Sequence, residues 1–382
     1  MREQAPRALL LSGPFGLGHE MPARGFAGVL RQSGWQVRAK DSMELLGGAG
    51  NRAGLRVFGG LMKVPGAYDG LHFAGLRTGG GVARLMDRAS ARRVVPALRA
   101  DLAREPADLV LSVFATGALA AAGLKREAPA RHTVVYCPDV AAHKLWVHEG
   151  SDLFLVSSPA AMASVRRFRP RAAVAIVPPP VRSAFYAAPS RAAARDALAV
   201  PRDVQCVLLI DSGWGFAPLA AAAAGLADAG VRVLAVAGRN AAVARRLRDL
   251  ARSRPAITAF GFTGEVPALM AASDLVVALP GAATCAEARV VGRRLLLLDV
   301  MPGHGRDNLL HELEQGNAGV CGPAAADVVA AALAMLDGAA GAGSPSPAPR
   351  WEPAFAAALA CIGVNIGLST DTRSETTCAP SS

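Results

Sequence analysis

The chain has 382 residues, of which 52% are hydrophobic and 5% aromatic, and it carries a formal net charge of +11. That length exceeds what one ordinary hydrophobic core organises, so we expect two domains. No stretch reaches the roughly 18 to 20 apolar residues of a membrane-spanning helix, and the apolar run near the N-terminus is too short for a signal peptide. The positive charge suits binding to nucleic acid or to an anionic membrane face. Because aromatic residues are few and the sequence contains no nucleic-acid-binding motif, we do not expect nucleic acid to be a partner.

The first half of the chain alternates short apolar runs with helical patterns, and this rhythm predicts a parallel sheet that helices cover on both faces. The predicted strands are residues 8–12, 35–39, 108–113, 132–136, 152–157 and 173–177. The predicted helices lie near residues 21–33, 82–104, 114–126 and 159–168.

The alternation stops at PPPVRSAFYAAPS, residues 178–190, because three consecutive prolines favour an extended path. We place a hinge there, and a second α/β series follows. Its predicted strands are residues 204–210, 231–238, 257–262, 274–279 and 294–300, and its predicted helices lie near 217–229, 240–253, 265–273 and 283–292. We therefore expect an α/β protein of two Rossmann-like, doubly wound domains that face each other across a cleft, with ligands beyond the carboxyl ends of the strands.

These patterns place one domain at residues 1–180 and a second at residues 181–337. The segment GAAGAGSPSPAPR, residues 338–350, has low complexity and is expected to be a flexible linker. Residues 351–368 are apolar enough for a C-terminal helix that docks on the body, and the polar end, residues 369–382, is expected to be disordered.

The stretch SGPFGLGHE, residues 12–20, lies between the first predicted strand and the first predicted helix. A glycine-rich turn that leads into a helix presents backbone N–H groups and the positive end of the helix to an anion or a polar ligand. The glycines leave room for that ligand, and His19 is expected to point at it. The alternative is a plain tight turn with a solvated histidine.

Four later stretches also lie where predicted strands end. They are IDSGWGFAPL (210–219), GFTGEVPALMAASDL (261–275), LPGAATCAEA (279–288) and MPGHGRDNLL (301–310). The first offers backbone amides to an anion, the second offers backbone groups to a planar ring, and the fourth carries side chains that hydrogen-bond hydroxyls. The third leads into a helix N-terminus that can hold a diphosphate, with Glu287 placed to bind a vicinal diol such as a ribose. Each stretch alone is also typical of an ordinary βα loop.

A resemblance to a family of glycosyltransferases is carried first by residues 274–320, DLVVALPGAATCAEARVVGRRLLLLDVMPGHGRDNLLHELEQGNAGV, which are similar to the family's donor-nucleotide region. The family includes monogalactosyldiacylglycerol synthases, processive diglucosyldiacylglycerol synthases and the peptidoglycan enzyme that adds N-acetylglucosamine to lipid I. GLGH (16–19) looks like its glycine-rich loop, and LRVFGGLMKVPGAYDGLHFAGLR (55–77) looks like the acceptor-side segment of the diacylglycerol enzymes. YCPDVAAHKLWVHEGSDLFLVSSP (136–159) is similar to their segment with an aspartate, a downstream histidine and a tryptophan. The resemblance covers about residues 6–337.

The resemblance implies a GT-B fold and an inverting, metal-independent transfer of a hexose from a UDP-sugar to a lipid acceptor such as diacylglycerol. The first domain then binds the acceptor, and the second binds the nucleotide sugar. No cofactor is implied beyond the UDP-hexose donor, and no metal site is implied. The implied location is cytoplasmic, with peripheral binding to the inner, anionic face of the plasma membrane.

On the donor side, the resemblance assigns roles by position. Gly281 and Ala282 approach the diphosphate ahead of Thr284, near which the helix starts, and Glu287 binds the ribose. The other donor-side residues are Gly213 and Gly215 in the glycine-rich loop, Phe262 beside the uracil ring, and His304 and Asn308 at the sugar hydroxyls.

On the acceptor side, the resemblance matches His19 and Asp139 to positions for acceptor binding and general-base catalysis. Asp139 is the first candidate for the base because a carboxylate is already ionised at neutral pH. His19 is the second candidate, and it can equally orient Asp139 or bind the acceptor headgroup. The alternatives are a turn aspartate after Pro138 and, for His143 and His148, solvated or structural histidines.

The sequence departs from the family at two donor-side positions. Leu279 stands where the family usually has Lys or Arg, and Ala282 replaces its second glycine. The missing cation removes a charge-assisted contact to the diphosphate, commonly worth about 1.5 to 3 kcal/mol. Either Arg306 or another arginine supplies the missing positive charge, or the protein uses a different donor, or its activity has decreased. Two alternative functions stay open: a glycosyltransferase that acts on a soluble metabolite and, as Leu279 and Ala282 suggest, a nucleotide-sugar-binding protein without turnover.

Two segments of the first domain combine apolar and basic side chains. Residues 55–77 suit an interfacial helix or loop on anionic lipid, and packing as a core helix is the alternative. Five arginines at helical spacing follow, and they are also typical of a solvated face: Arg84, Arg88, Arg92, Arg93 and Arg99.

Overall fold

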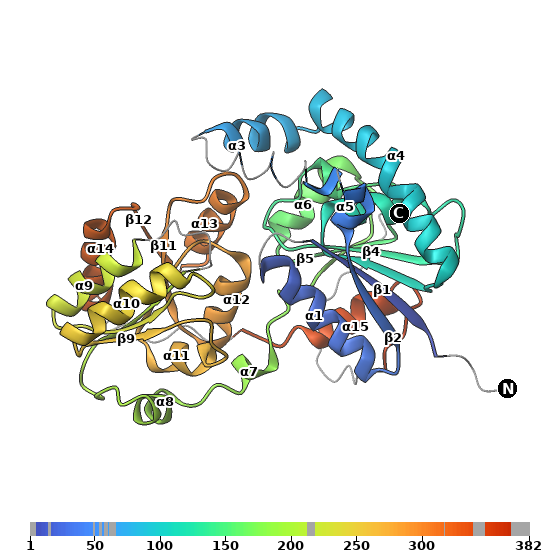
Figure 1. The fold of residues 1–382 in the computed structure, drawn as a ribbon. Helices are drawn as coiled ribbons and strands as arrows, with labels where there is room; N and C mark the ends of the chain where they lie inside the picture. The colour runs from blue at the N-terminus through green and yellow to red at the C-terminus, as the bar shows by residue number, and fades with distance from the viewer. Residues whose placement is uncertain are drawn as a thin grey trace. The chain divides into compact units, whose positions relative to one another are not determined.

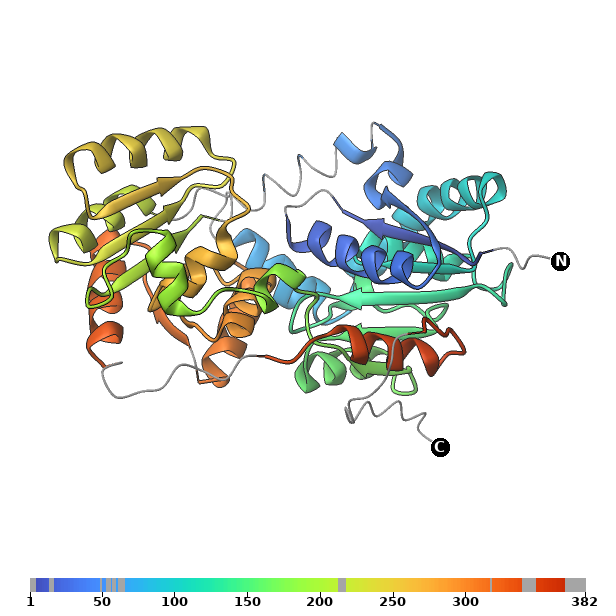
Figure 2. The same cartoon turned by 90° about the horizontal axis from the view of Figure 1, so that it is seen from below.

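The structure is a computed structural model, and it describes residues 5–13, 17–48, 50–52, 56, 60, 66–211, 218–316, 318–338 and 348–367. The chain forms two compact units, each built on its own sheet of six parallel strands (Figures 1 and 2). Unit 1 comprises Met1–Pro180, Pro302–His304 and Arg350–Ser382, and unit 2 comprises Val181–Met301 and Gly305–Pro349.

The sheet of unit 1 has the strand order β2-β1-β3-β4-β5-β6. Its strands are β1 (Arg7–Ser12), β2 (Gln36–Asp41), β3 (Leu109–Ser112), β4 (His132–Cys137), β5 (Leu153–Val156) and β6 (Val174–Ile176). All six were predicted, because β1 and β3 to β6 are short apolar runs that are buried along most of their length, as expected for a parallel sheet.

Helices cover both faces of this sheet. The longer helices are α1 (Leu17–Gln32), α4 (Gly81–Arg104), α5 (Ala115–Gly123), α6 (Pro159–Phe168) and α15 (Glu352–Ala360). On one face, Phe26 of α1 packs against Tyr136 and against Phe355 of α15, with ring centroids 5.1 and 4.6 Å apart. On the other face, Gly117 of α5 lies so close to β1 and β3 that a Cβ there would collide with Ser112 and Leu11.

The remaining elements of unit 1 are short. They are the 3-10 helices η1 (Ser42–Leu46) and η3 (Lys144–Trp146), the single turn α3 (Ala67–Asp69), and the π-helix η2 (Gly70–Leu76). Of the acceptor-side segment 55–77, residues 55, 57–59 and 61–65 lie outside the described residues. The π-helix was not predicted, and such turns occur often at functional sites.

The sheet of unit 2 has the strand order β12-β11-β10-β7-β8-β9. Its strands are β7 (Cys206–Ile210), β8 (Arg232–Val236), β9 (Ile257–Phe260), β10 (Leu275–Ala278), β11 (Arg294–Leu298) and β12 (Ala318–Cys321). The first five were predicted. The sixth was missed, because Ala318–Cys321 contains a glycine and is buried only at its last residue.

Side chains that alternate along these strands form two cores, one on each face of the sheet. Leu208, Leu234 and Val276 belong to one core, and the neighbouring Leu209 and Val277 belong to the other. The helices are α7 (Ser183–Tyr186), α8 (Arg191–Ala197), α9 (Leu219–Asp228), α10 (Ala241–Ser253), α11 (Val266–Ala272), α12 (Ala282–Val291), α13 (His304–Glu314) and α14 (Ala325–Asp337). α7, α8, α13 and α14 were not predicted.

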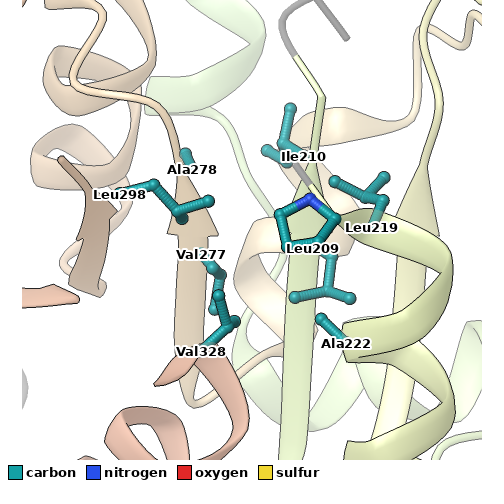
Figure 3. Close-up of a pocket in the computed structure, with 9 residues that line it drawn as sticks. Leu209, Ile210, Leu219, Ala222, Val277, Ala278, Leu298 and Val328 are labelled. Carbon is teal, nitrogen blue, oxygen red and sulfur yellow. The ribbon is translucent and has the colours of Figure 1, made fainter. Parts of the chain in front are cut away.

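The order of strands in unit 2 reverses at β7. β7 pairs with β8 on one side and with β10 on the other, so the chain winds away in both directions from this point. In doubly wound sheets, ligands bind beyond the carboxyl ends of the strands at such a switch point. Figure 3 shows a narrow apolar pocket there, which Ile210 and Ala278 line at the strand ends and Leu219 lines from α9.

Candidate functional site

In unit 1, His19 lies in the first turn of α1 and is half-buried. Its Nδ1 lies 2.9 Å from the carbonyl oxygen of Val113, and its ring meets the ring of Phe114 edge-on at 4.9 Å. Burial lowers the pKa of His19, and the charge of Asp139 opposes that effect. Because a carbonyl oxygen only accepts, the neutral ring carries its proton on Nδ1, which leaves Nε2 as an acceptor for a hydroxyl proton.

Asp139 follows β4 and is half-buried in the same region. Its charge acts on several neighbouring groups: besides His19, it raises the pKa of the Tyr68 hydroxyl and of the Cys137 thiol, although burial is the larger cause of both shifts. Asp139 therefore lies near His19 and Tyr68, as a base and its partners must.

Tyr68, in α3, was not among the predicted site residues. Its hydroxyl lies 3.3 Å from Nδ1 of His304, which belongs to unit 1 with Pro302 and Gly303. The backbone N–H of Gly303 donates to Oδ1 of Asp69 at 2.6 Å. The raised pKa of Tyr68 keeps its phenol neutral and able to donate.

Two further histidines lie next to this region. Burial lowers the pKa of His143 to about 3, and its ring centroid lies 5.9 Å from that of His72 and 6.2 Å from that of Trp146. Among the described residues, nothing hydrogen-bonds the buried Nδ1 of His143. His148 is different: its Nε2 donates to the carbonyl of Leu145 at 2.9 Å, and burial lowers its pKa to about 4. His148 thus has a structural contact.

In unit 2, the predicted diphosphate site is the start of α12. Gly281 occupies the N-cap position with an extended backbone, and no side chain among the described residues caps the helix. The backbone N–H groups of Ala282 and the residues after it are therefore available to an anion, with the half-buried Thr284 in the same turn. Asn308 is buried, and its amide donates to the carbonyl of Pro280 at 3.4 Å, which supports the turn before the helix.

Glu287 lies about one turn beyond Thr284, and 17% of its side chain is exposed. Burial raises its pKa to about 7, and the guanidinium of Arg182 opposes that shift. The Nη2 atom of Arg182 lies 3.9 Å from Oε1 of Glu287, and the guanidinium stacks on the ring of Phe185 at 4.9 Å. Sequence reasoning missed Arg182, whose only signal was its place after the three prolines.

The other donor-side positions differ in exposure. Leu279 is buried at 2% exposure, so no side-chain cation reaches the site from there. Phe262 is 62% exposed, and Arg239 stacks on it. Arg306 lies 3.5 Å from Asp299. Gly213 and Gly215 lie outside the described residues.

Known proteins are similar in sequence to part of this chain. No protein-family model matches it. The processive diacylglycerol β-glucosyltransferase of Bacillus pumilus is 25% identical over 174 residues, which are 44% of this chain and 45% of that protein. The probable chloroplastic monogalactosyldiacylglycerol synthase of Glycine max is 29% identical over 131 residues, which are 32% of this chain and 24% of that protein. The matched segments span less than half the length of these curated relatives.

Several solved structures share the fold over most of the chain. MnaA of S. aureus, solved with UDP, has a TM-score of 0.60 and 11% identity over 96% of this chain and 100% of that chain. MurG of Acinetobacter baumannii has a TM-score of 0.54 and 14% identity over 87% of this chain and 91% of that chain. The fold is that of the GT-B glycosyltransferases. The predicted fold class and the predicted resemblance to lipid glycosyltransferases are thereby confirmed.

Each unit brings some of the predicted residues close together. In unit 1, Asp139 lies close enough to His19 and Tyr68 for its charge to raise the pKa of each, and Tyr68 contacts His304. In unit 2, the start of α12 and Glu287 lie together. Among the described residues, no group of three or more His, Cys, Asp or Glu side chains is placed to hold a metal ion.

Proposed function

We propose that this protein is an inverting glycosyltransferase that moves a hexose from a UDP-sugar to the hydroxyl of a lipid such as diacylglycerol, without a metal ion. One observation carries the proposal: in unit 2, the uncapped start of α12 and the half-buried carboxyl of Glu287 lie one turn apart, as a diphosphate and a ribose diol require. The sequence relatives, both named for lipid glycosylation, favour a lipid acceptor.

The acceptor half would supply the base. The oxygen of the acceptor hydroxyl attacks the anomeric carbon, and the bond from that carbon to the β-phosphate oxygen breaks, so UDP leaves with the electron pair. A single displacement of this kind inverts the anomeric centre. The hydroxyl proton goes to the carboxylate of Asp139, and Nε2 of His19 is the alternative acceptor for that same proton.

The donor half would stabilise the leaving group. Charge develops on the departing diphosphate, and the backbone N–H groups at Gly281 and Ala282, with the positive end of α12, favour that charge. Glu287 would accept hydrogen bonds from the two ribose hydroxyls, which holds the nucleotide at the end of the sheet. We assign His304 and Asn308 to the sugar hydroxyls and Phe262 to the uracil ring.

An anionic membrane surface is the partner that this function needs, and α4 has the side chains for it. Val82, Leu85 and Met86 are 51%, 69% and 40% exposed, one turn apart on the outer face of α4. Arg84 and Arg88 lie among them and are exposed. No helix among the described residues is both long and apolar enough to cross a bilayer. We propose peripheral binding through this face to the inner leaflet of the plasma membrane.

The experiment is a transfer assay with purified protein, diacylglycerol in phosphatidylglycerol vesicles, and UDP-glucose, UDP-galactose or UDP-N-acetylglucosamine, one at a time. With EDTA present throughout, mass spectrometry of the lipid fraction should show one added hexose, and proton NMR of the product should show an inverted anomeric centre. Equal transfer to a soluble alcohol without vesicles would favour a soluble acceptor. Tight UDP binding with no transfer to any acceptor would leave a nucleotide-sugar-binding protein without turnover.

A further inference from the structure

Two loops at the carboxyl edge of the unit 2 sheet lie against each other. The first follows β8 and contains Gly238 and Arg239, and the second follows β9 and contains Gly261 and Phe262. Gly238 has a φ of +56°, which favours glycine, and a Cβ there would lie 3.3 Å from the carbonyl oxygen of Asp211 at the end of β7. A Cβ on Gly261 would lie 4.0 Å from the carbonyl oxygen of Gly238. The three strand ends β7, β8 and β9 are thus in contact at this edge.

The backbone of Arg239 is held in place by its neighbours, whereas its side chain is exposed. The next residue, Asn240, caps α10 by accepting a hydrogen bond from the N–H of Val243 at 3.2 Å. The guanidinium of Arg239 lies over the ring of Phe262, 4.8 Å from its centroid. No carboxylate among the described residues pairs with this guanidinium. An unpaired cation therefore rests on an exposed aromatic ring at the ligand-binding edge of the sheet.

The other arginines near this edge are already engaged. Arg182 faces Glu287, and Arg306 lies 3.5 Å from Asp299. Position 279, at the end of β10, holds a buried leucine. Of these arginines, Arg239 is the exposed one for which the described part of the chain offers no acidic partner. A planar guanidinium matches the oxygens of a phosphate.

We propose that Arg239 is the cation that binds the diphosphate of the donor nucleotide, in place of the cation that position 279 lacks. In the nucleotide-free protein the guanidinium stacks on Phe262, and on binding it leaves the ring for the phosphate oxygens. This frees the face of Phe262 for the base. The inference rests on the proposed function, because it takes a uridine diphosphate as the ligand.

The test is isothermal titration calorimetry with UDP and with uridine, on the full chain and on Arg239→Gln, Arg239→Lys and Arg245→Gln. Arg239→Gln should bind UDP about 10- to 100-fold more weakly and uridine as well as the wild type does. Arg239→Lys should lie between them, because it keeps the charge and loses the planar fork. Arg245 is an exposed arginine of α10, so Arg245→Gln should bind UDP like the wild type.

Salt dependence provides a second readout that a loss of folding would not mimic. Wild-type affinity for UDP should fall more steeply with added NaCl than that of Arg239→Gln, since one fewer ion pair is screened. Unchanged UDP affinity in Arg239→Gln would overturn the inference and leave the proposed function intact. A parallel loss for uridine would also overturn it, because it would assign Arg239 to the base. Absence of UDP binding by the wild type would instead overturn the proposed function.

Discussion

Arg182 and Glu287 form an ion pair in unit 2, with Nη2 of the arginine 3.9 Å from Oε1 of the glutamate. The guanidinium of Arg182 does not fully offset the effect of burial on Glu287. Burial raises the pKa of Glu287 to about 7, although the guanidinium opposes the shift. A carboxyl that is half protonated near neutral pH needs partners for its charged form, and the ribose hydroxyls of a nucleotide are such partners.

The stability of unit 2 should depend on the protonation of Glu287. Its pKa rises from 4.5 to about 7 on folding, so the stabilisation from the bound proton is complete below pH 4.5 and is lost as the pH rises through 7. Urea denaturation at pH 4.5 and pH 8 measures this. Between the lower and the higher pH, the unfolding free energy of the wild type should fall by up to about 3 kcal/mol more than that of Glu287→Gln. The matched control, Glu314→Gln on the exposed side of α13, should show no such divergence from the wild type.

Donor binding should respond to the same ionisation in the opposite direction. If the carboxylate of Glu287 accepts the ribose hydroxyls, UDP affinity rises with pH through about 7. Arg182→Gln removes the opposing charge, so the midpoint of this rise should shift to higher pH, and UDP affinity at pH 7 should fall several-fold. Calorimetry from pH 6 to pH 9 checks both statements. A pH-independent UDP affinity in the wild type would contradict the role of Glu287.

The acceptor residues should separate chemistry from donor binding. Asp139→Asn removes the proposed base and should lower the turnover rate by about 10² to 10⁴-fold. His19→Ala should also abolish measurable transfer. Both variants should keep the UDP affinity of the wild type, because the residues assigned to the uridine diphosphate lie in unit 2. Single-turnover assays measure the transfer step, and calorimetry on the same preparations measures UDP affinity. Wild-type turnover in both variants would refute the assignment of Asp139 and His19 to the acceptor site.

The sequence predicted eleven of the twelve strands, because continuous apolar runs are a strong signal of buried parallel strands. Four helices of unit 2 were missed, and for two of them the reason is local. Prolines 178–180 favour an extended path, but α7 begins soon after them at Ser183, and Ser190 caps α8. Asn240 and Ser158 show the opposite case, since each caps a helix that was predicted.

The candidate site was predictable where a residue follows a strand, and less so where two distant segments meet. His19 and Asp139 each lie just beyond a strand, so parallel-sheet topology brings them to one edge. Tyr68 lies in a single helical turn before a π-helix, and no periodicity indicates its contact with His304. The pairing of Arg182 with Glu287 joins positions far apart in the chain, and such a contact has no local signal.

Membrane binding should depend on the apolar side chains of α4 more than on its charge alone. Helix α10 provides the comparison: its exposed arginines are Arg245, Arg246, Arg248 and Arg252, and it has no exposed large apolar residue among the described ones. Apolar insertion adds to electrostatic attraction at an anionic surface, and attraction without insertion is weak in physiological salt. α4 combines both, because Val82, Leu85 and Met86 project beside Arg84 and Arg88.

The combined variant Val82→Ser, Leu85→Ser, Met86→Ser should therefore lose binding to phosphatidylglycerol vesicles by about tenfold or more in sedimentation assays at 0.15 M salt. The control variant Leu310→Ser, Val320→Ser removes two other exposed apolar side chains, 53% and 45% exposed in unit 2, and should bind like the wild type. Each variant should keep transfer to a dispersed short-chain diacylglycerol, because no residue of the acceptor or donor site is changed. If both variants bound vesicles as well as the wild type does, the membrane would contact another face. A loss of vesicle binding in the control variant alone would place that face in unit 2.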